Sequence, residues 1–303
     1  MTSAPRSPEV ATSSTEALAH GSEGLHQLDA ESLIARFDDE QASITRALSD
    51  ARPRIAELAR SMARALAGEG RVIYVGAGTS GRLGVLDAAE WSPTFAVDPT
   101  RVLGRIAGGP RALSAAVEGA EDDEASAEED LEALSFAARD LLIGLSASGG
   151  APYVRRALCV ARERGAARAL ITAGEPPIAD PELLVVRLST GPEILAGSTR
   201  LKAATATHQV LQRASTACAV LSGWVYAGRM VEMRPTNRKL RDRAERIVAE
   251  LGELPRAEAA ALLRECGDDI KVALVARRLT IDPTRARAEL ANVGRRLTEI
   301  PGF

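Results

Sequence analysis

Two Ser- and Gly-rich loops are the part of the sequence best suited to bind an anion. They lie at residues 76–81 and 146–150, and each follows a short apolar run and precedes a stretch with helical spacing. Glycines let a ligand approach the backbone closely, and hydroxyl groups bind phosphate together with the free N–H groups of a helix start. Helix capping alone does not explain two Ser- and Gly-rich loops that each follow a predicted strand. The pattern therefore predicts a site for a phosphorylated small molecule.

The first loop also matches the Gly-x-Gly-x-x-Gly fingerprint of dinucleotide-binding folds, at Gly76, Gly78 and Gly81. In those folds an acidic residue ends a second strand about 20 residues further on. The sequence lacks that acidic strand end, and Thr79 and Ser80 inside the loop favour phosphate. We therefore rank nucleotide binding below binding of a phosphorylated small molecule.

Carboxylates are the best candidates for proton transfer. The sequence holds three histidines, none in a setting that suggests a general base: His20, His26 and His208. Glu90 follows the first loop along the chain, and Glu118 lies among small apolar residues, a setting that suits acid–base work near neutrality. A solvated position is the alternative for Glu118, and residues 121–132 are typical of a solvated acidic helix face.

A third candidate segment, residues 191–202, precedes a long predicted helix. Ser198 or Thr199 would cap that helix, while Arg200 and Lys202 place positive charge near its start. Positive charge at a helix N-terminus opposes the helix dipole. A bound anion therefore explains these side chains better than helix stability does.

The elements that must position these residues follow an alternating pattern. Four short apolar runs are separated by loops and helical stretches, and they lie at residues 71–75, 141–145, 167–171 and 184–188. Helical stretches are predicted at 111–137 and 151–164. Strands that alternate with helices indicate a parallel sheet covered on both faces, and ligands of such sheets bind at the carboxyl ends of the strands. Both loops would lie at that edge.

The same reading divides the chain into three parts. Residues 1–27 are rich in Ser, Thr, Ala and Pro without a period, which predicts a flexible tail. Residues 28–235 contain both the sheet and the N-terminal helices of the phosphate-binding domain. Residues 199–250 are predicted to be helical. Residues 236–303 form a small C-terminal helical domain, with about three short helices over residues 255–299.

Composition excludes several classes of function. The 38 Lys and Arg residues and 41 Asp and Glu residues give a formal net charge of −3, which argues against a nucleic-acid binder despite a basic run at 234–243. That run could instead bind phosphate or pack at a subunit boundary. No apolar run reaches the roughly 18 residues of a membrane span, and no signal pattern is found at the N-terminus. Three widely spaced cysteines predict reduced thiols in a cytoplasmic protein.

Taken together, these segments resemble the N-acetylmuramic acid 6-phosphate etherase family within the sugar isomerase (SIS) superfamily. The matching segments run in order along the chain, at residues 73–90, 106–109, 116–122, 147–154, 197–203 and 236–240. Six segments in register are far more specific than either loop alone.

The resemblance implies an α/β fold, with an SIS-type parallel sheet sandwiched by helices and a small C-terminal three-helix domain. It also implies a homodimer that cleaves the D-lactyl ether of N-acetylmuramic acid 6-phosphate with water, in cell-wall amino-sugar recycling or catabolism. The family's two functional glutamates fall on Glu90 and Glu118. We predict that the phosphorylated amino sugar is bound by these residues: Gly78, Thr79, Ser80, Gly81, Arg82, Ser146, Ser148, Gly149, Ser198 and Lys202.

Two carboxylates can catalyse this reaction without a metal or a cofactor. The open-chain sugar has an aldehyde beside carbon 2, so that removal of the carbon 2 proton lets lactate leave from carbon 3, after which water adds back. We assign Glu118 as the base and Glu90 as the acid, and the order of the two could be the reverse. A non-catalytic sugar-phosphate-sensing regulator and a phosphosugar isomerase are the alternatives.

Two positions depart from the family pattern. Gly150 stands where family members have a longer polar side chain, and the Asn that normally follows Thr15-Glu16 is absent. Both departures concern substrate affinity and specificity and leave the two glutamates in place.

Overall fold

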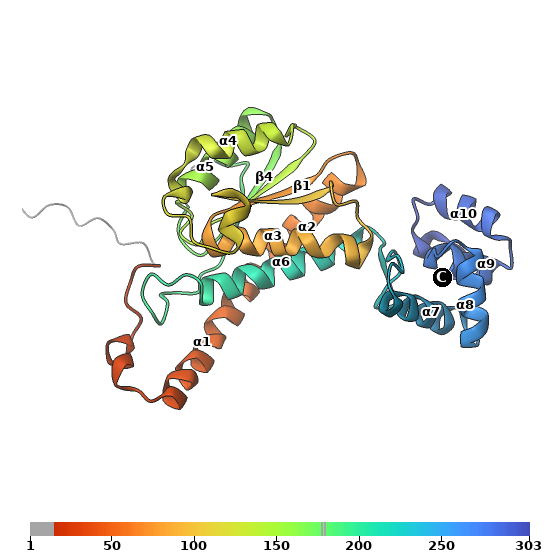
Figure 1. Cartoon of the computed structure of the whole chain (residues 1–303), viewed down its shortest axis with the longest axis horizontal. Coiled ribbons are helices and arrows are strands. Elements are labelled where there is room, and N and C mark those ends of the chain that lie inside the picture. The colour runs from red at the N-terminus through yellow and green to blue at the C-terminus, as the bar shows by residue number, and fades with distance from the viewer. Residues whose placement is uncertain (1–14, 177, 179) are drawn as a thin grey trace, which may run out of the picture.

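Five short parallel strands form the centre of the N-terminal part of the protein (Figure 1). The computed structural model describes residues 15–176, 178 and 180–303. The strand order is β2-β1-β3-β4-β5, and the strands are β1 (Val72–Gly76), β2 (Val102–Ile106), β3 (Leu141–Leu145), β4 (Ala167–Thr172) and β5 (Leu184–Arg187). The parallel sheet expected from the alternating pattern is confirmed.

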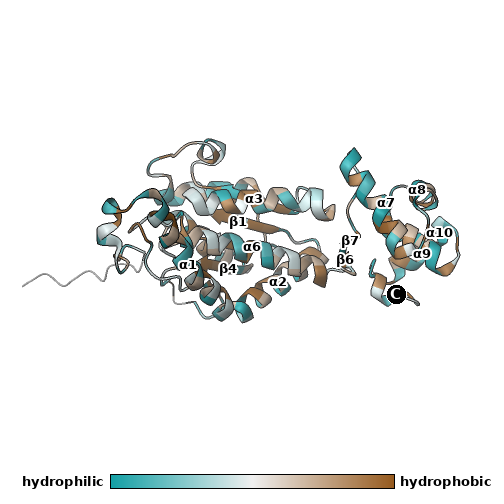
Figure 2. Cartoon of the chain, turned by 90° about the horizontal axis from the view of Figure 1, so that it is seen from below, coloured by the Kyte–Doolittle hydropathy of each residue, from teal (hydrophilic) through white to brown (hydrophobic). Residues whose placement is uncertain are grey.

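Helices cover both faces of this sheet. One face packs against α2 (Arg52–Ala67), α3 (Gly78–Phe95) and α6 (Lys202–Leu221), and α1 (Ala30–Asp50) packs on α6 and α2. The other face packs against α4 (Glu124–Ala133) and α5 (Pro152–Glu163). Successive side chains of a strand point to opposite faces. Tyr74 accordingly joins the first core and Ile73 the second. Strands buried on both sides explain the continuous apolar runs, and Figure 2 shows β1 in the hydrophobic colour.

The structure differs from the sequence-based expectation at two elements. Strand β2 was missed because Gly104 and Arg105 interrupt its apolar pattern, and its middle residues are only half-buried. The helix expected over 111–137 is three pieces: the 3-10 turns η2 (Gly109–Leu113) and η3 (Ala120–Asp122), and α4. Gly119 between them has φ of 72°, which a continuous helix does not allow.

The C-terminal residues build a unit with its own hydrophobic core, which lies to one side of the sheet in Figure 1. A short hairpin of β6 (Val225–Tyr226) and β7 (Arg229–Met230) interrupts the helix expected over 199–250. The region 255–299 contains the three short helices expected: α8 (Arg256–Glu265), α9 (Ile270–Leu279) and α10 (Pro283–Asn292). Helix α7 (Arg238–Gly252) joins their core through Ile247 and Val248, so this unit has four helices.

The residues before α1 are in part built into the structure. Residues 1–14 of the expected tail lie outside the described residues. Thr15 and Ala19 are buried, and Ser22–Gln27 form the 3-10 helix η1. The flexibility of the tail and the domain boundaries at 27 and 235 stay predictions. Within the described ranges, no helix combines the length and the apolar character needed to cross a membrane.

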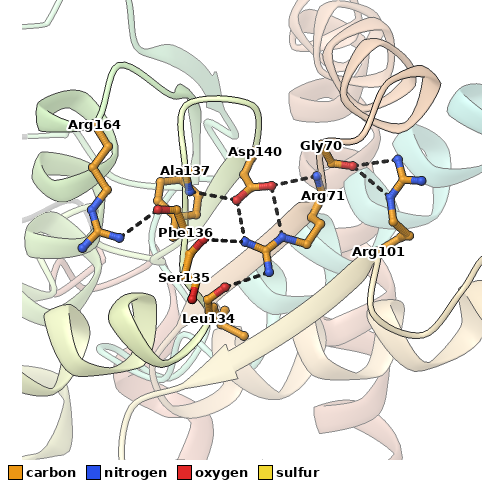
Figure 3. A network of polar contacts seen from close by, with 9 residues as sticks. All are labelled: Gly70, Arg71, Arg101, Leu134, Ser135, Phe136, Ala137, Asp140 and Arg164. Carbon is orange, nitrogen blue, oxygen red and sulfur yellow. Dashed lines mark hydrogen bonds and ion pairs between the residues drawn. The ribbon is translucent and has the colours of Figure 1, made fainter.

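A buried ion pair holds the amino ends of β1 and β3 together (Figure 3). The Arg71 guanidinium donates to both carboxylate oxygens of Asp140, at 3.1 and 2.7 Å, and to the carbonyls of Leu134 and Ser135. Asp140 also accepts from the backbone N–H groups of Arg71 and Ala137. Burial alone would raise the pKa of Asp140, but the hydrogen bonds from Arg71 and Ala137 outweigh burial and hold it below its ordinary value.

We predict that Asp140→Ala lowers the free energy of unfolding by about 3–5 kcal/mol at pH 7, because it leaves Arg71 without its partner. A carboxylate with a lowered folded-state pKa stabilises the fold above its unfolded pKa of about 3.9, and this contribution is lost as the pH falls through the folded-state pKa. Urea titrations of both proteins measure the difference. It should be full at pH 6–7 and shrink below pH 4, and a difference that grew in acid would contradict the assignment.

Candidate active site

The two Ser- and Gly-rich loops lie next to each other at the carboxyl edge of the sheet. Strands β1 and β3 are paired in register, with Gly76 opposite Leu145, so that the loops leave the sheet side by side. Helix α3 starts at Gly78, and in the described structure no side chain hydrogen-bonds to its start. Thr79 and Ser80 are half-buried in its first turn. These hydroxyls and the N–H groups of the helix start form a suitable cradle for an anion.

Gly76, Gly81 and Gly84 bring α3 close to β1. A Cβ on Gly81 would lie 2.7 Å from the carbonyl oxygen of Gly76, and a Cβ on Gly84 would lie 2.9 Å from the Cβ of Tyr74. Both distances are shorter than real Cβ contacts. The glycines of the first loop therefore serve helix packing as well as ligand approach.

In the second loop the two serines have different surroundings. Ser146 is buried, and its hydroxyl accepts from the N–H of Gly149 at 3.1 Å, which shapes the turn. Ser148 is exposed, and its hydroxyl accepts from the N–H of Gly150 at 3.2 Å. The Ser148 O–H can therefore still donate to a ligand, whereas the role of Ser146 in this structure is to hold the loop. Gly149 has φ of 78°, which favours glycine.

A cavity of about 240 Å³ joins the first loop to the segment that carries Glu118. It is lined by Gly78, Thr79 and Arg82 on one side and by residues 115–121 on the other. The structure thus brings Glu118 and the predicted phosphate loop together. Glu118 itself is exposed, as in the solvated alternative weighed from the sequence.

Arg82 connects α3 to the Glu118 segment. Its guanidinium donates to the carbonyl of Leu113 at 3.2 Å and to that of Ala115 at 3.3 Å. Sequence reasoning assigned Arg82 to substrate binding and did not anticipate these contacts, because no local pattern pairs residues 31 and 33 positions apart. Arg82 faces the cavity and also holds one of its walls.

Glu90 lies further along α3 and is exposed, and it is not among the residues that line the Glu118 cavity. The two glutamates are therefore on the surface of the single chain rather than in a closed pocket. The sequence placed Glu90 after the first loop, and the structure adds that Glu90 and the second half of that loop, from Gly78 on, belong to the same helix α3. Within the described ranges, no three His, Cys, Asp or Glu side chains are grouped as metal ligands.

The segment before α6 differs from the expectation. Neither Ser198 nor Thr199 caps the helix. Instead the buried carboxylate of Glu193 accepts from the backbone N–H groups of Lys202 and Ala203, at 2.9 and 3.0 Å. The anion expected at this helix start is thus a side chain of the protein itself, since a carboxylate satisfies free N–H groups at a positive helix end. Sequence reasoning missed Glu193 because it precedes the helix by eight residues.

Two predicted binding residues, Ser198 and Lys202, lie in the same region. Ser198 is half-buried, and its N–H donates to the carbonyl of Leu195. The Lys202 ammonium is buried and forms an ion pair with Glu40 of α1. In the structure Lys202 therefore fastens α1 to the start of α6, and its role toward a ligand stays a prediction.

Comparisons with known proteins relate the chain to a family model over part of its length and to named relatives over most of it. A family model described as the glucokinase regulatory protein N-terminal SIS domain matches residues 54–162. A protein of Gloeobacter violaceus named N-acetylmuramic acid 6-phosphate etherase is 45% identical, over 95% of this chain and 95% of its own. One of the same name from Crocosphaera subtropica is 46% identical over 86% of each chain.

Solved structures are more distant. A phosphoheptose isomerase from Neisseria gonorrhoeae is 18% identical, with a TM-score of 0.44 over 63% of this chain and 98% of its own. A phosphoheptose isomerase from Francisella tularensis is 16% identical, with a TM-score of 0.46 over 63% of this chain and 96% of its own.

We predict that Arg82→Ala releases the segment that carries Glu118. Loss of two hydrogen bonds worth about 1 kcal/mol each should raise amide exchange over residues 111–119 by about tenfold or more. Hydrogen–deuterium exchange with peptide-level mass spectrometry measures this. Arg54→Ala, which removes an exposed Arg paired only with Glu57, is the matched control. Unchanged exchange over 111–119 in Arg82→Ala would show that other contacts hold the segment.

Proposed function

The chain belongs to the N-acetylmuramic acid 6-phosphate etherase family, and from this premise we propose that it cleaves the D-lactyl ether of N-acetylmuramic acid 6-phosphate with water. The products are N-acetylglucosamine 6-phosphate and D-lactate. The observation that carries the proposal is 45% identity to a named etherase over 95% of both chains. The regulatory-protein model, by contrast, matches only residues 54–162. The pathway would be recycling or catabolism of cell-wall amino sugars.

The phosphate of the substrate binds at the carboxyl edge of the sheet. Support comes from the start of α3 at Gly78, the half-buried Thr79 and Ser80, and the exposed hydroxyl of Ser148 in the neighbouring loop. Ser146 and Gly149 keep the second loop in shape. Gly150 adds no side chain beside Ser148, so the polar contact that a longer residue would supply there is missing or comes from elsewhere.

Glu118 and Glu90 carry the chemistry. Glu118 takes the proton from carbon 2 of the open-chain sugar, the bond between carbon 3 and the lactyl oxygen breaks, and Glu90 gives a proton to the departing lactate oxygen. Water then adds its oxygen to carbon 3 and a proton returns to carbon 2, so that the net reaction consumes one water. The cavity between the first loop and Glu118 supports this placement of the base.

The active unit is a homodimer. Both glutamates are exposed on the single chain, and a second subunit would enclose them and limit access of bulk water to the site. A second copy would cover exposed apolar side chains of this chain as well, among them Leu86 on α3 and Ile34 and Phe37 on α1. In Figure 1, α1 extends away from the sheet, where it is open to a second subunit.

The protein acts in the cytoplasm. Its cysteines are unpaired, and two of them, Cys218 and Cys266, are buried. Burial raises the pKa of the Cys218 thiol to about 12 and that of Cys266 to about 11, so both stay protonated and unreactive. Such thiols suit a reducing compartment.

The direct test of the function is incubation with N-acetylmuramic acid 6-phosphate in labelled water. We expect release of D-lactate, with solvent oxygen on carbon 3 of the sugar product and solvent hydrogen on carbon 2. Enzymatic detection of D-lactate and mass spectrometry of both products measure this. Label found only in lactate would exclude elimination, whereas isomerisation without lactate would indicate a phosphosugar isomerase. Binding without turnover would indicate a regulator.

Removal of a phosphate-binding hydroxyl should weaken substrate binding. For Ser80→Ala and Ser148→Ala we expect KM to rise by roughly 10- to 100-fold with a smaller change in kcat, because a hydrogen bond to a charged group contributes about 1.5–3 kcal/mol. Ser61→Ala on α2, whose hydroxyl accepts only from Arg64, serves as the matched control. An unchanged preference for the phosphorylated over the unphosphorylated sugar in both variants would place the phosphate elsewhere.

Removal of Glu118 and removal of Glu90 should affect different steps of the reaction. For Glu118→Gln we expect both carbon 2 exchange and lactate release to fall by at least about 10²–10⁴-fold, the range typical of a lost general acid or base. Glu90→Gln should stop lactate release and retain slow exchange. NMR in deuterated water follows the exchange, and Glu132→Gln on the exposed face of α4 is the control. If carbon 2 exchange were lost in Glu90→Gln and kept in Glu118→Gln, Glu90 would be the base and Glu118 the acid. Normal turnover in both variants would refute the paired mechanism.

A further inference from the structure

A buried carboxylate lies in α3 one turn before Glu90, and the mechanism above does not use it. Asp87 accepts hydrogen bonds from Tyr74 Oη of β1 at 2.8 Å, from Trp91 Nε1 of α3 at 2.9 Å and from Ser215 Oγ of α6 at 3.3 Å. Asp87 is 8% exposed. Its single side chain thus joins strand β1, the helix that carries Glu90 and the long helix α6.

The three donors of Asp87 are all uncharged, which makes the arrangement unusual for a core. Desolvation of a carboxylate is expensive, and an apolar side chain of similar size generally packs a core as well or better. Burial raises the pKa of Tyr74 well above its ordinary value, and the charge of Asp87 raises it further, so the Tyr74 hydroxyl stays a donor. Unlike an apolar residue, the carboxylate fixes the orientation of the elements that it joins, because hydrogen bonds depend on direction as well as distance.

The backbone of α3 needs such support at this turn. Pro93 lies inside the helix and has no N–H, so it cannot donate to the carbonyl of Ala89. Asp87 and Trp91 both point inward on either side of the exposed Glu90. The hydrogen bond between their side chains joins residues 87 and 91 from the inside, and it overlaps the first half of the turn from 89 to 93 that lacks a backbone bond.

We propose that Asp87 is a positioning residue for Glu90: its hydrogen bonds to β1, Trp91 and α6 set the rotation of α3 about its own axis, and with it the direction of the Glu90 carboxylate. This inference rests on the proposed function, which makes Glu90 the acid. The first turns of α3 are held separately, by the close contacts of Gly81 and Gly84 with β1. Loss of Asp87 should therefore affect kcat through Glu90 more than KM through the phosphate loop.

The test compares Asp87→Ala with Asp87→Asn in the lactate-release assay. A displacement of about 1 Å at a catalytic group can cost about 10²-fold in rate, so we expect Asp87→Ala to lower kcat by roughly 100-fold with KM within about threefold. In Asp87→Asn the amide oxygen can accept from Tyr74 and Trp91 while its NH₂ group donates to Ser215. This variant should keep kcat within about threefold of the wild-type value.

Asp140→Ala is the matched control, because Asp140 is also a buried, hydrogen-bonded carboxylate but lies at the amino edge of the sheet. It should lower thermal stability at least as much as Asp87→Ala and leave both kcat and KM within about twofold. Equal losses of kcat in Asp87→Ala and Asp140→Ala would show that Asp87 contributes to stability alone. Equal losses in Asp87→Asn and Asp87→Ala would show that the charge itself is required, and either result overturns the inference.

A measurement that needs no activity separates this inference from the proposed function. Hydrogen–deuterium exchange over residues 88–92 should be faster in Asp87→Ala, and unchanged in Asp87→Asn and Asp140→Ala. If the wild-type protein releases no D-lactate, the proposed function fails, and unchanged exchange in Asp87→Ala refutes the inference independently. If Asp87→Ala does not fold, Tyr74→Phe, which removes one donor and keeps the ring, should lower kcat by about 3- to 10-fold at constant KM. An unaltered kcat would then count against the inference.

Discussion

The close contact between β1 and α3 is the constraint on which the rest of the site depends. The helix approaches the strand this closely because Gly81 faces Gly76 backbone to backbone and because Gly84 leaves room for the side chain of Tyr74. The contact brings the start of α3 to the carboxyl edge of the sheet, where a helix start attracts an anion. Because Glu90 lies on the same helix and Arg82 holds the Glu118 segment, the position of α3 determines where both candidate catalytic groups lie.

Much of this arrangement could be predicted from local patterns in the sequence. The interior strands β1 and β3 are buried along their whole length, and β4 and β5 are also mostly apolar, so all four were found from their apolar runs. The Ser- and Gly-rich loops follow β1 and β3. The adjacency of the loops then follows from the geometry of parallel sheets. Strand β2 was missed because Gly104 and Arg105 interrupt its apolar pattern: it lies at the edge of the sheet, and a Cβ on Gly104 would lie 2.6 Å from the Cα of Val85 in α3.

Contacts between distant parts of the chain could not be predicted in this way. Periodicity indicates which face of an element is buried, but it does not say which partner covers that face. Glu193 at the start of α6, Glu40 beside Lys202 and Ser215 beside Asp87 are all brought in by the tertiary fold. The exposure of Glu90 and Glu118 is of the same kind, since it depends on the surroundings of the folded chain rather than on their neighbours in sequence.

The strand order has a consequence for the newly made chain. The interior strand β1 pairs with β2 and β3, and its register with β3 joins Val72 to Leu141, so β1 leaves the ribosome long before its second neighbour is available. Non-local parallel pairing is slow, and unpaired apolar strand edges invite aggregation in the meantime. The helices before β1 are made first: α2 packs against the face of β1 that carries Tyr74, and α1 packs on α2. They can shield that face of the strand during synthesis, while its hydrogen-bonding edges stay open until β3 arrives.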